Sequence, residues 1–89
     1  MRFTWYEPKR QVTLKKRGLD FAHAERVFQG PTFTFEDDRA DYGERRWVTL
    51  GLLRDKVVVV VHTETETEIR VISMREAEPD EQILFFSNL

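Results

Sequence analysis

The chain contains no cysteine, which excludes disulfide bonds and thiolate metal sites, so the core has to hold by packing alone. Its only two histidines, His23 and His62, are far apart in the sequence, which argues against a dedicated transition-metal site. No apolar run reaches the roughly 18 residues that a membrane span needs, and no signal-peptide pattern opens the sequence. We therefore expect a cytoplasmic protein that holds no metal or cofactor and makes no contact with a membrane.

The net charge of −2 conceals an uneven distribution of charge along the chain. Residues 1–30 hold seven Lys and Arg against three Asp and Glu, whereas residues 31–89 hold seven against thirteen. The overall acidity argues against avid, non-specific binding of nucleic acid, because such binding depends on neutralised phosphate charge. The basic N-terminal part could face a polyanion, or it could simply keep a small protein in solution. The length of 89 residues, with 40% hydrophobic content, predicts a single domain, 1–89.

A valine-rich hairpin is the strongest structural signal in the sequence. Val57–Val61 is too β-branched for a comfortable helix and continuous enough to be buried on both faces of a sheet. A second strand, Glu68–Met74, follows a short polar turn within Glu64–Glu66, which predicts an antiparallel pair. Arg70 lies within this second strand and Arg75 just past its end. Strand-borne guanidiniums are held in place, so we expect any chemistry beside this hairpin.

Shorter patterns place the other elements. Pro8 suits the first turn of a helix that ends before Gly18, and Asp20 is a good N-cap for a second helix, Phe21–Phe28. The remaining elements are expected to be strands Arg2–Trp5, Thr32–Phe35 and Arg45–Leu53, and a C-terminal helix entered at Pro79. This order predicts an α+β fold in which two N-terminal helices pack on an antiparallel β-meander, with a helix at the C-terminus.

Two further segments allow more than one interpretation. The acidic run Glu36–Gly43 lacks the ligand spacing of a calcium loop and is expected to be a solvated loop. The C-terminal segment holds more apolar side chains than one face of a short helix can bury: Ile83, Leu84, Phe85, Phe86 and Leu89. We expect some of these apolar side chains to contact either a partner protein or a second copy of the chain. Contact with a second copy would form a homo-oligomer.

Five short motifs occur in an order that spans nearly the whole chain. They are Phe3 and Trp5 with Lys9; Lys16 and Gly18 before the Phe21–Phe28 helix; Gly43, Glu44 and Arg46 before Thr49, Leu50 and Gly51; Val60–Glu64; and Ile69 and Arg70 followed by Ile72, Ser73, Arg75 and Ala77. The last motif, read after a valine-rich strand, is the most telling. Together they resemble the BrnT-type toxins of bacterial toxin–antitoxin pairs, whose fold is similar to that of the RelE-type ribonucleases.

The resemblance implies a small, metal-independent endoribonuclease that slows translation. It also implies a protein partner, an antitoxin with a ribbon-helix-helix part that binds DNA. The complex would repress its own promoter, and the antitoxin rather than this chain would contact the DNA. RNA can be cleaved without a metal ion because its 2′-hydroxyl is an internal nucleophile. Such an enzyme needs a base for that hydroxyl, cations for the charge on phosphorus, and an acid for the leaving oxygen.

Carried over position by position, the resemblance assigns the site residues. The arginines expected to hold the scissile phosphate are Arg46, Arg70 and Arg75. The residues expected to contact the RNA further out are Lys9, Lys16 and Arg17. His62 is the only histidine on the hairpin and the best available proton carrier near neutral pH. Each assignment has a structural alternative: a turn hydrogen bond for His62, a helix-dipole role for the basic residues at the helix end, and carboxylate partners such as Glu44, Glu68 or Glu81 for the arginines.

The sequence also departs from the pattern of this family. Arg17 and Phe85 stand where a histidine and a tyrosine are common, and Thr13 and Tyr6 where an asparagine and an aspartate are usual. Phenylalanine cannot transfer a proton, so two acid–base groups are missing. An alternative function is therefore a catalytically inactive homologue that serves as a binding module for an antitoxin-like repressor. In either case the surface expected to bind the partner is formed by Phe85, Phe86 and Leu89.

Overall fold

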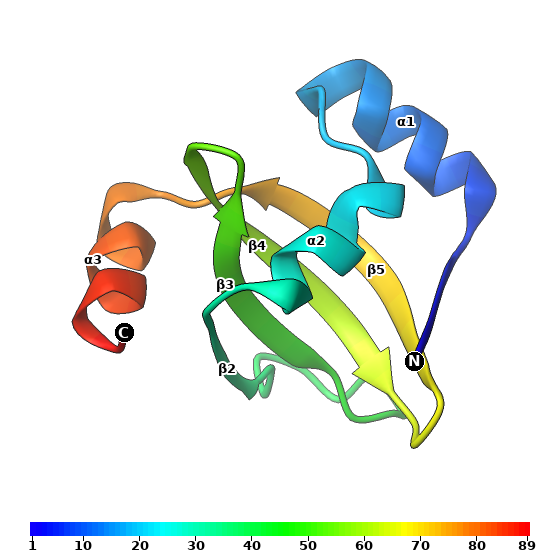
Figure 1. Cartoon of the computed structure of the whole chain (residues 1–89). Helices are drawn as coiled ribbons and strands as arrows, with labels where there is room; N and C mark the ends of the chain where they lie inside the picture. The colour runs from blue at the N-terminus through cyan, green and yellow to red at the C-terminus, as the bar shows by residue number, and fades with distance from the viewer.

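The computed structural model describes all 89 residues, which form a five-stranded sheet. Helices lie on both faces of this sheet (Figure 1). The elements in chain order are β1 (Arg2–Trp5), α1 (Glu7–Arg17), the 3-10 turn Phe21–His23, α2 (Ala24–Gln29), β2 (Thr32–Glu36), β3 (Trp47–Leu53), β4 (Lys56–Glu64), β5 (Glu68–Glu76) and α3 (Pro79–Ser87). The strand order across the sheet is β1-β5-β4-β3-β2, so the predicted hairpin β4–β5 lies inside it. None of the helices is long and apolar enough to cross a membrane.

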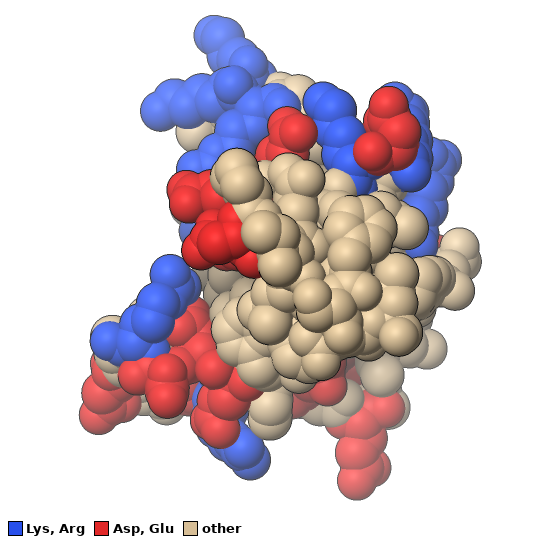
Figure 2. Space-filling model, turned by 90° about the vertical axis from the view of Figure 1, so that its left-hand side faces the viewer, with Lys and Arg blue, Asp and Glu red and all other residues tan.

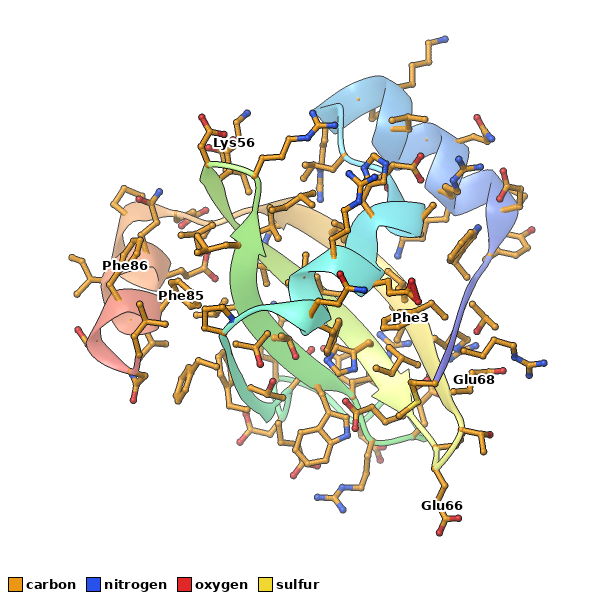
Figure 3. All side chains as sticks on the ribbon, viewed as in Figure 1. Phe3, Lys56, Glu66, Glu68, Phe85 and Phe86 are labelled. Carbon is orange, nitrogen blue, oxygen red and sulfur yellow. The ribbon has the colours of Figure 1, made fainter.

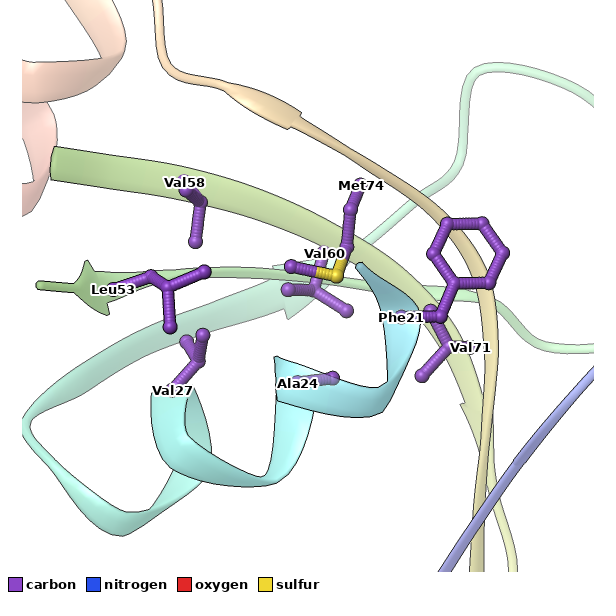
Figure 4. Close-up of a cluster of buried hydrophobic side chains, with 8 residues drawn as sticks. All are labelled: Phe21, Ala24, Val27, Leu53, Val58, Val60, Val71 and Met74. Atoms are coloured by element: carbon purple, nitrogen blue, oxygen red, sulfur yellow. The ribbon is translucent and has the colours of Figure 1, made fainter. Parts of the chain in front are cut away.

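The valine strand separates two apolar clusters, because successive residues of a strand point to opposite faces. Val58 and Val60 pack with Phe21 and Val27 on the α2 face, the cluster drawn in Figure 4. The remaining valines, Val57, Val59 and Val61, pack with Phe85 of α3 on the other face. All five valines are buried, which confirms the prediction that this strand is covered on both sides.

The helix α2 lies directly on the sheet (Figure 1). Asp20 caps the 3-10 turn Phe21–His23 that leads into this helix, since its carboxylate accepts a hydrogen bond from the backbone N–H of Ala22 at 2.9 Å. Val27 packs so closely over Gly51 of β3 that a Cβ at this glycine would lie 2.5 Å from Val27 Cγ1. The close approach of helix and strand therefore depends on the missing side chain at position 51.

The helix α3 covers the opposite face at one end of the sheet. A reciprocal capping box between Glu78 and Glu81 begins the helix, with Pro79 in its first turn. Phe85 points from the helix towards the sheet and is completely buried, whereas Phe86 lies on the outer side (Figure 3). Burial of this one aromatic ring attaches a helix that would be too short to persist alone.

The predicted fold class is wrong in two respects. β1 pairs with β5 in parallel, from Arg2 opposite Glu68 to Trp5 opposite Val71, so the sheet is mixed rather than an antiparallel meander. One helix is N-terminal, one is central and one is C-terminal. Of the first two, α2 packs on the sheet through buried apolar side chains, whereas α1 does not. α1 buries only Thr13, because it is rich in Lys and Arg and has few apolar residues. A four-residue strand whose partner is more than 60 residues away leaves no local pattern that would reveal a parallel pair.

A β-bulge in β5 decides which side chains share a face. Val61 pairs with Ser73 and His62 pairs with Val71, so Ile72 is an extra residue in β5. Without it, Arg70 and Arg75 would point to opposite faces, because they are an odd number of residues apart. With it, Arg70 lies opposite Thr63 and Arg75 opposite Val59, both of which point to the α3 face.

Candidate functional site

A cleft of about 350 Å³ opens on the α3 face of the sheet. Its floor is formed by valines of the central strands, Val48, Val59 and Val61. Its walls come from three directions: Arg17 from the end of α1, Asp37–Arg39 from the loop after β2, and Glu81 from the first turn of α3. The cleft therefore joins segments from the beginning, middle and end of the chain around a rigid apolar floor.

Arg75 and Glu81 form a two-point ion pair in this cleft. Arg75 donates from Nη1 and Nη2 to the two carboxylate oxygens of Glu81, both at 2.7 Å. This pairing holds the pKa of the Glu81 carboxyl below its usual value and raises the pKa of Arg75. Such a two-point contact fixes both the position and the plane of the guanidinium.

Two further arginines enter the same cleft, and one of them was not predicted. Arg39 donates from Nε and Nη2 to the buried carboxylate of Asp37, at 2.7 and 2.8 Å. Arg17 donates from Nη1 to the backbone carbonyl of Met74 at 2.9 Å, so it reaches across the edge of β5. The prediction that the whole acidic loop is solvated does not include Arg39; the one signal for this residue is a basic side chain within an acidic run.

A second group of cations lies on the same face, nearer the β4–β5 turn. Lys9, Arg46 and Arg70 line a smaller cleft of about 150 Å³ together with Tyr6. Glu44 accepts a hydrogen bond from Arg70 Nη2 at 2.8 Å and lies 3.6 Å from Arg46 Nε, so one carboxylate bridges two arginines. Burial lowers the pKa of Lys9, and the positive charges of Arg46 and Arg17 lower it further. One carboxylate against three cations leaves this cleft with an excess of positive charge.

The aromatic ring of Tyr42 fixes one member of this group. The guanidinium of Arg46 lies 4.0 Å from the centre of the Tyr42 ring, a cation–π contact. Its Nε is buried and has no hydrogen-bond partner within the protein. An unpaired buried donor of this kind carries a free-energy cost that an incoming acceptor would remove.

Residues 5–81 of the chain match the model of a family described as the ribonuclease toxin, BrnT, of type II toxin–antitoxin systems. The chain belongs to the BrnT toxin family. The resemblance seen in the sequence is thereby confirmed, and with it the expectation that an antitoxin is the toxin's partner. No curated protein sequence matches the chain closely enough to be compared with it.

In this BrnT toxin the three arginines predicted to hold the phosphate do not line one cleft. Arg46 and Arg70 lie together in the smaller cleft, and Arg75 lies in the larger one with Arg17 and Arg39. All of them face the same side of the sheet, because the bulge at Ile72 brings both ends of β5 into line. The carboxylate partners anticipated as the structural alternative are present for Arg70 and Arg75, although each pair remains open to solvent.

His62 lies on the α2 face, away from both clefts of the BrnT toxin. Its ring is fully buried, packs edge-on against Phe28 at 5.1 Å, and shares a 2.7 Å hydrogen bond between Nε2 and the hydroxyl of Thr49. Burial lowers the pKa of His62 to about 4. Glu64 lies 3.4 Å from Nδ1, but this carboxylate is exposed to solvent and makes no hydrogen bond to the ring. A buried, neutral imidazole on the far face does not fit the predicted role of proton carrier.

The remaining predicted residues divide between surface and core. Lys16 is exposed in the last turn of α1 and lines neither cleft. Phe85 is completely buried, so it cannot itself contact a partner, and the expected partner surface does not include it. Phe86 and Leu89 are exposed, together with Ile83 and Leu84. Figure 2, which looks onto the α3 side of the BrnT toxin, shows a broad uncharged surface with Lys, Arg, Asp and Glu around its edge.

One acidic group has the spacing of a cation site. Oxygen atoms of Glu78, Asp80 and Glu81, in and beside the first turn of α3, lie within 4.8 Å of one another. Both oxygens of Glu81 already accept hydrogen bonds from Arg75, so a cation there would compete with a guanidinium. This arrangement fits an ion pair at a helix start better than a metal site.

Proposed function

We propose that this BrnT toxin cleaves RNA by attack of the 2′-hydroxyl on the adjacent phosphate, without a metal ion. The observation that carries the proposal is the collection of cations on one face of the sheet, in two neighbouring groups. In a phosphoryl reaction of this kind, negative charge increases on the oxygens bound to phosphorus, and fixed guanidiniums stabilise it. The stiff valine strands hold those guanidiniums before RNA arrives, which reduces the cost of ordering them.

The smaller cleft is suited to grip one phosphate. Arg46 retains an unpaired buried donor, Arg70 is half exposed, and Lys9 adds a third positive charge. Glu44 holds the two arginines together in the absence of RNA and can give way to a phosphate, which offers more acceptor oxygens. We assign Arg46, Arg70 and Lys9 to RNA binding here, and Arg75 with Arg17 to the reacting end of the substrate in the larger cleft.

Cleavage of labelled single-stranded RNA in the presence of EDTA tests this proposal. The wild-type toxin should cleave RNA when divalent ions are chelated, and Arg70→Ala should lower the rate by about 10²–10³-fold through loss of a charge contact. Arg26→Ala is the matched control, since Arg26 is exposed on α2 on the other side of the sheet. Loss of all cleavage in EDTA, restored by Mg²⁺, would contradict the metal-free mechanism.

In the cell, RNA cleavage of this kind would slow translation. Expression of the toxin without its antitoxin should therefore arrest growth, and Arg70→Ala or Arg75→Ala should relieve the arrest at equal protein abundance. Normal growth with abundant folded wild-type toxin would oppose this part of the proposal. It would instead favour the second candidate function below.

The exposed apolar side chains of α3 are the proposed docking surface for the antitoxin, which we expect to carry a ribbon-helix-helix DNA-binding part. Ile83, Leu84 and Phe86 of α3 and Leu89 just beyond its end are exposed, and the chain itself does not cover them. Phe86→Asp should abolish co-purification of toxin and antitoxin, whereas Val12→Asp, at an equally exposed apolar residue of α1, should not. If Phe86→Asp still retains the antitoxin, this surface is not the docking site. If the isolated toxin self-associates and Phe86→Asp abolishes that self-association, the surface binds a second copy of the toxin instead.

A second candidate function is a catalytically silent toxin that acts only by holding a repressor. It is favoured by the phenylalanine at position 85, which is buried under α3 and offers no proton. Phe85→Tyr should then restore no cleavage, since its hydroxyl would be placed in an apolar cluster. Co-purification with the antitoxin, combined with no cleavage of any RNA, would establish this alternative.

A further inference from the structure

The cleavage step requires a proton acceptor for the 2′-hydroxyl, and neither of the two expected groups supplies one. His62 is buried on the opposite face, and position 85 carries a phenylalanine. The groups able to accept a proton in the larger cleft are four carboxylates: Glu36, Asp37, Asp38 and Glu81. The geometry of each decides which one can serve.

Three of these carboxylates are poorly placed to act as a base. Asp37 is buried, and its two oxygens accept hydrogen bonds from Arg39 and from the hydroxyl of Tyr42. Glu36 accepts hydrogen bonds from Arg45, which does not line the cleft. Asp38 is exposed on the loop, and the ion pairs of Arg39 and Arg75 are made with other carboxylates. Glu81 is the only one of the four that is bound to Arg75.

The contacts of Glu81 leave it able to accept a proton. Its Oε1 accepts from Arg75 and from the backbone N–H of Glu78, whereas Oε2 accepts only from Arg75 and keeps a free lone pair. The hydrogen bonds from Arg75 hold the pKa of this carboxyl low, so it is ionised at neutral pH. The charged groups around it are Arg75 from β5, Arg39 from the loop, Arg17 from α1, and Glu78 and Asp80 at the start of its own helix.

Substrate binding would make Glu81 a stronger base. Arg75 donates three hydrogen bonds, two to Glu81 and a long one to the Glu76 carbonyl, out of the five that a guanidinium can donate. Two N–H groups therefore remain for a phosphate oxygen beside the carboxylate. A phosphate there would bring a second negative charge close to Glu81 and raise the pKa of its carboxyl.

We propose that Glu81 is the general base of the cleavage reaction, and that Arg75 positions it beside the phosphate, which Arg75 also binds. This proposal rests on the proposed function. The Glu81 carboxylate takes the proton from the 2′-hydroxyl while the 2′-oxygen forms a bond to phosphorus. The bond from phosphorus to the 5′-oxygen breaks, and that oxygen leaves with the electron pair and takes a proton from a water molecule. The resulting hydroxide removes the proton from Glu81, which restores the carboxylate. The products are a 2′,3′-cyclic phosphate and a 5′-hydroxyl.

Glu81→Gln tests this assignment with little disturbance of the fold. Glutamine at this position can still accept the hydrogen bond from the backbone N–H of Glu78, so the capping box and the start of α3 are kept. Asp80→Asn is the matched control, because it removes one carboxylate from the same helical turn without touching the cleft. Cleavage of single-stranded RNA is measured in EDTA as a function of pH. Binding is measured with the same RNA carrying 2′-O-methyl groups, which cannot be cleaved.

Glu81→Gln should lower kcat by about 10²–10³-fold and leave binding of the methylated RNA within about 3-fold of wild type. Its rate should then rise about tenfold per pH unit between pH 6 and pH 8.5, where wild type is flat, because hydroxide has to replace the missing base. Glu81→Asp should retain part of the activity. A role limited to positioning Arg75 predicts parallel pH profiles instead and would overturn the proposal.

Unchanged or increased cleavage by Glu81→Gln would also overturn the assignment. An increase would mean that Glu81 masks Arg75 from RNA. In both of these cases the wild-type enzyme still cleaves RNA in EDTA, so the proposed function stands. Absence of cleavage by wild type in EDTA removes the proposed function, and the base assignment with it.

Discussion

Mild acid should destabilise this toxin through one side chain, His62. Its ring is buried between Phe28 and the Thr49 hydroxyl, and burial lowers its pKa to about 4 from an ordinary value of 6.5. In the unfolded chain the His62 ring is therefore protonated below about pH 6.5, whereas in the folded chain it is protonated only below about pH 4. Because the unfolded state binds more protons in this window, stability falls as pH falls.

The size of the effect follows from the two pKa values. Between pH 7 and pH 5 the linkage relation gives a loss of about 2 kcal/mol in the free energy of unfolding, and below pH 4 the total approaches about 3 kcal/mol. Five carboxylates have lowered pKa values, and their ordinary values are 4.5 or less: Glu7, Asp20, Asp37, Glu68 and Glu81. They start to lose stabilising contacts only at lower pH, so the window from pH 7 to pH 5 isolates the histidine.

Urea unfolding at pH 7 and at pH 5 measures this loss. His62→Gln removes the titration and can keep a hydrogen bond to Thr49, so its free energy of unfolding should change far less between the two pH values, even if it is lower at both. His23→Gln, at the only other histidine, should lose as much stability as wild type. A loss below about 0.5 kcal/mol in wild type, or an equal loss in His62→Gln, would refute the reasoning.

Three further substitutions test the packing, each by chemical denaturation at neutral pH. Gly51→Ala should cost about 1–3 kcal/mol, because its Cβ would lie 2.5 Å from the buried Val27 side chain; an unchanged midpoint would show that α2 can move away freely. Phe85→Ala should cost about 3–5 kcal/mol through the cavity left under α3, and a cost below about 1 kcal/mol would mean that α3 is not fixed by this ring. Asp20→Ala should cost about 1–3 kcal/mol, since it removes both the cap on the Ala22 N–H and the carboxylate partner of Arg10, whose bonds are 2.7 and 3.0 Å long; Asp20→Asn, which keeps the cap, should cost less.

Much of the local structure could be predicted because it depends on neighbours in the sequence. The valine strand, its turn and the N-cap at Asp20 all agree with the structure, since β-branching, turn polarity and capping act over a few residues. The predicted strand Arg45–Leu53 is also present as β3, in which Leu50 packs on the α3 face and Thr49 bonds to His62 on the other. Burial of Phe85 was not predicted, because a short apolar helix does not reveal which of its residues faces the sheet.

The candidate site was predictable in its residue types and not in its arrangement. The motif around Arg70 and Arg75 indicated a cationic surface, yet one extra residue at Ile72 decides that both point to the same face. Arg39 and Glu81 were not predicted as site residues, since the loop and helix that carry them meet Arg75 only in the folded chain.

The sequence alone determined the family, the hairpin and the burial of the valine strand on both faces, because hydrophobic runs and short motifs are properties of neighbouring residues. Only the tertiary structure decided that β1 lies parallel to β5, that His62 is buried on the far face, and that Glu81 binds Arg75. The first two facts depend on contacts between distant segments, which the pairing of the whole sheet selects. The third depends on how the chain turns from β5 into α3, because Arg75 and Glu81 are only six residues apart.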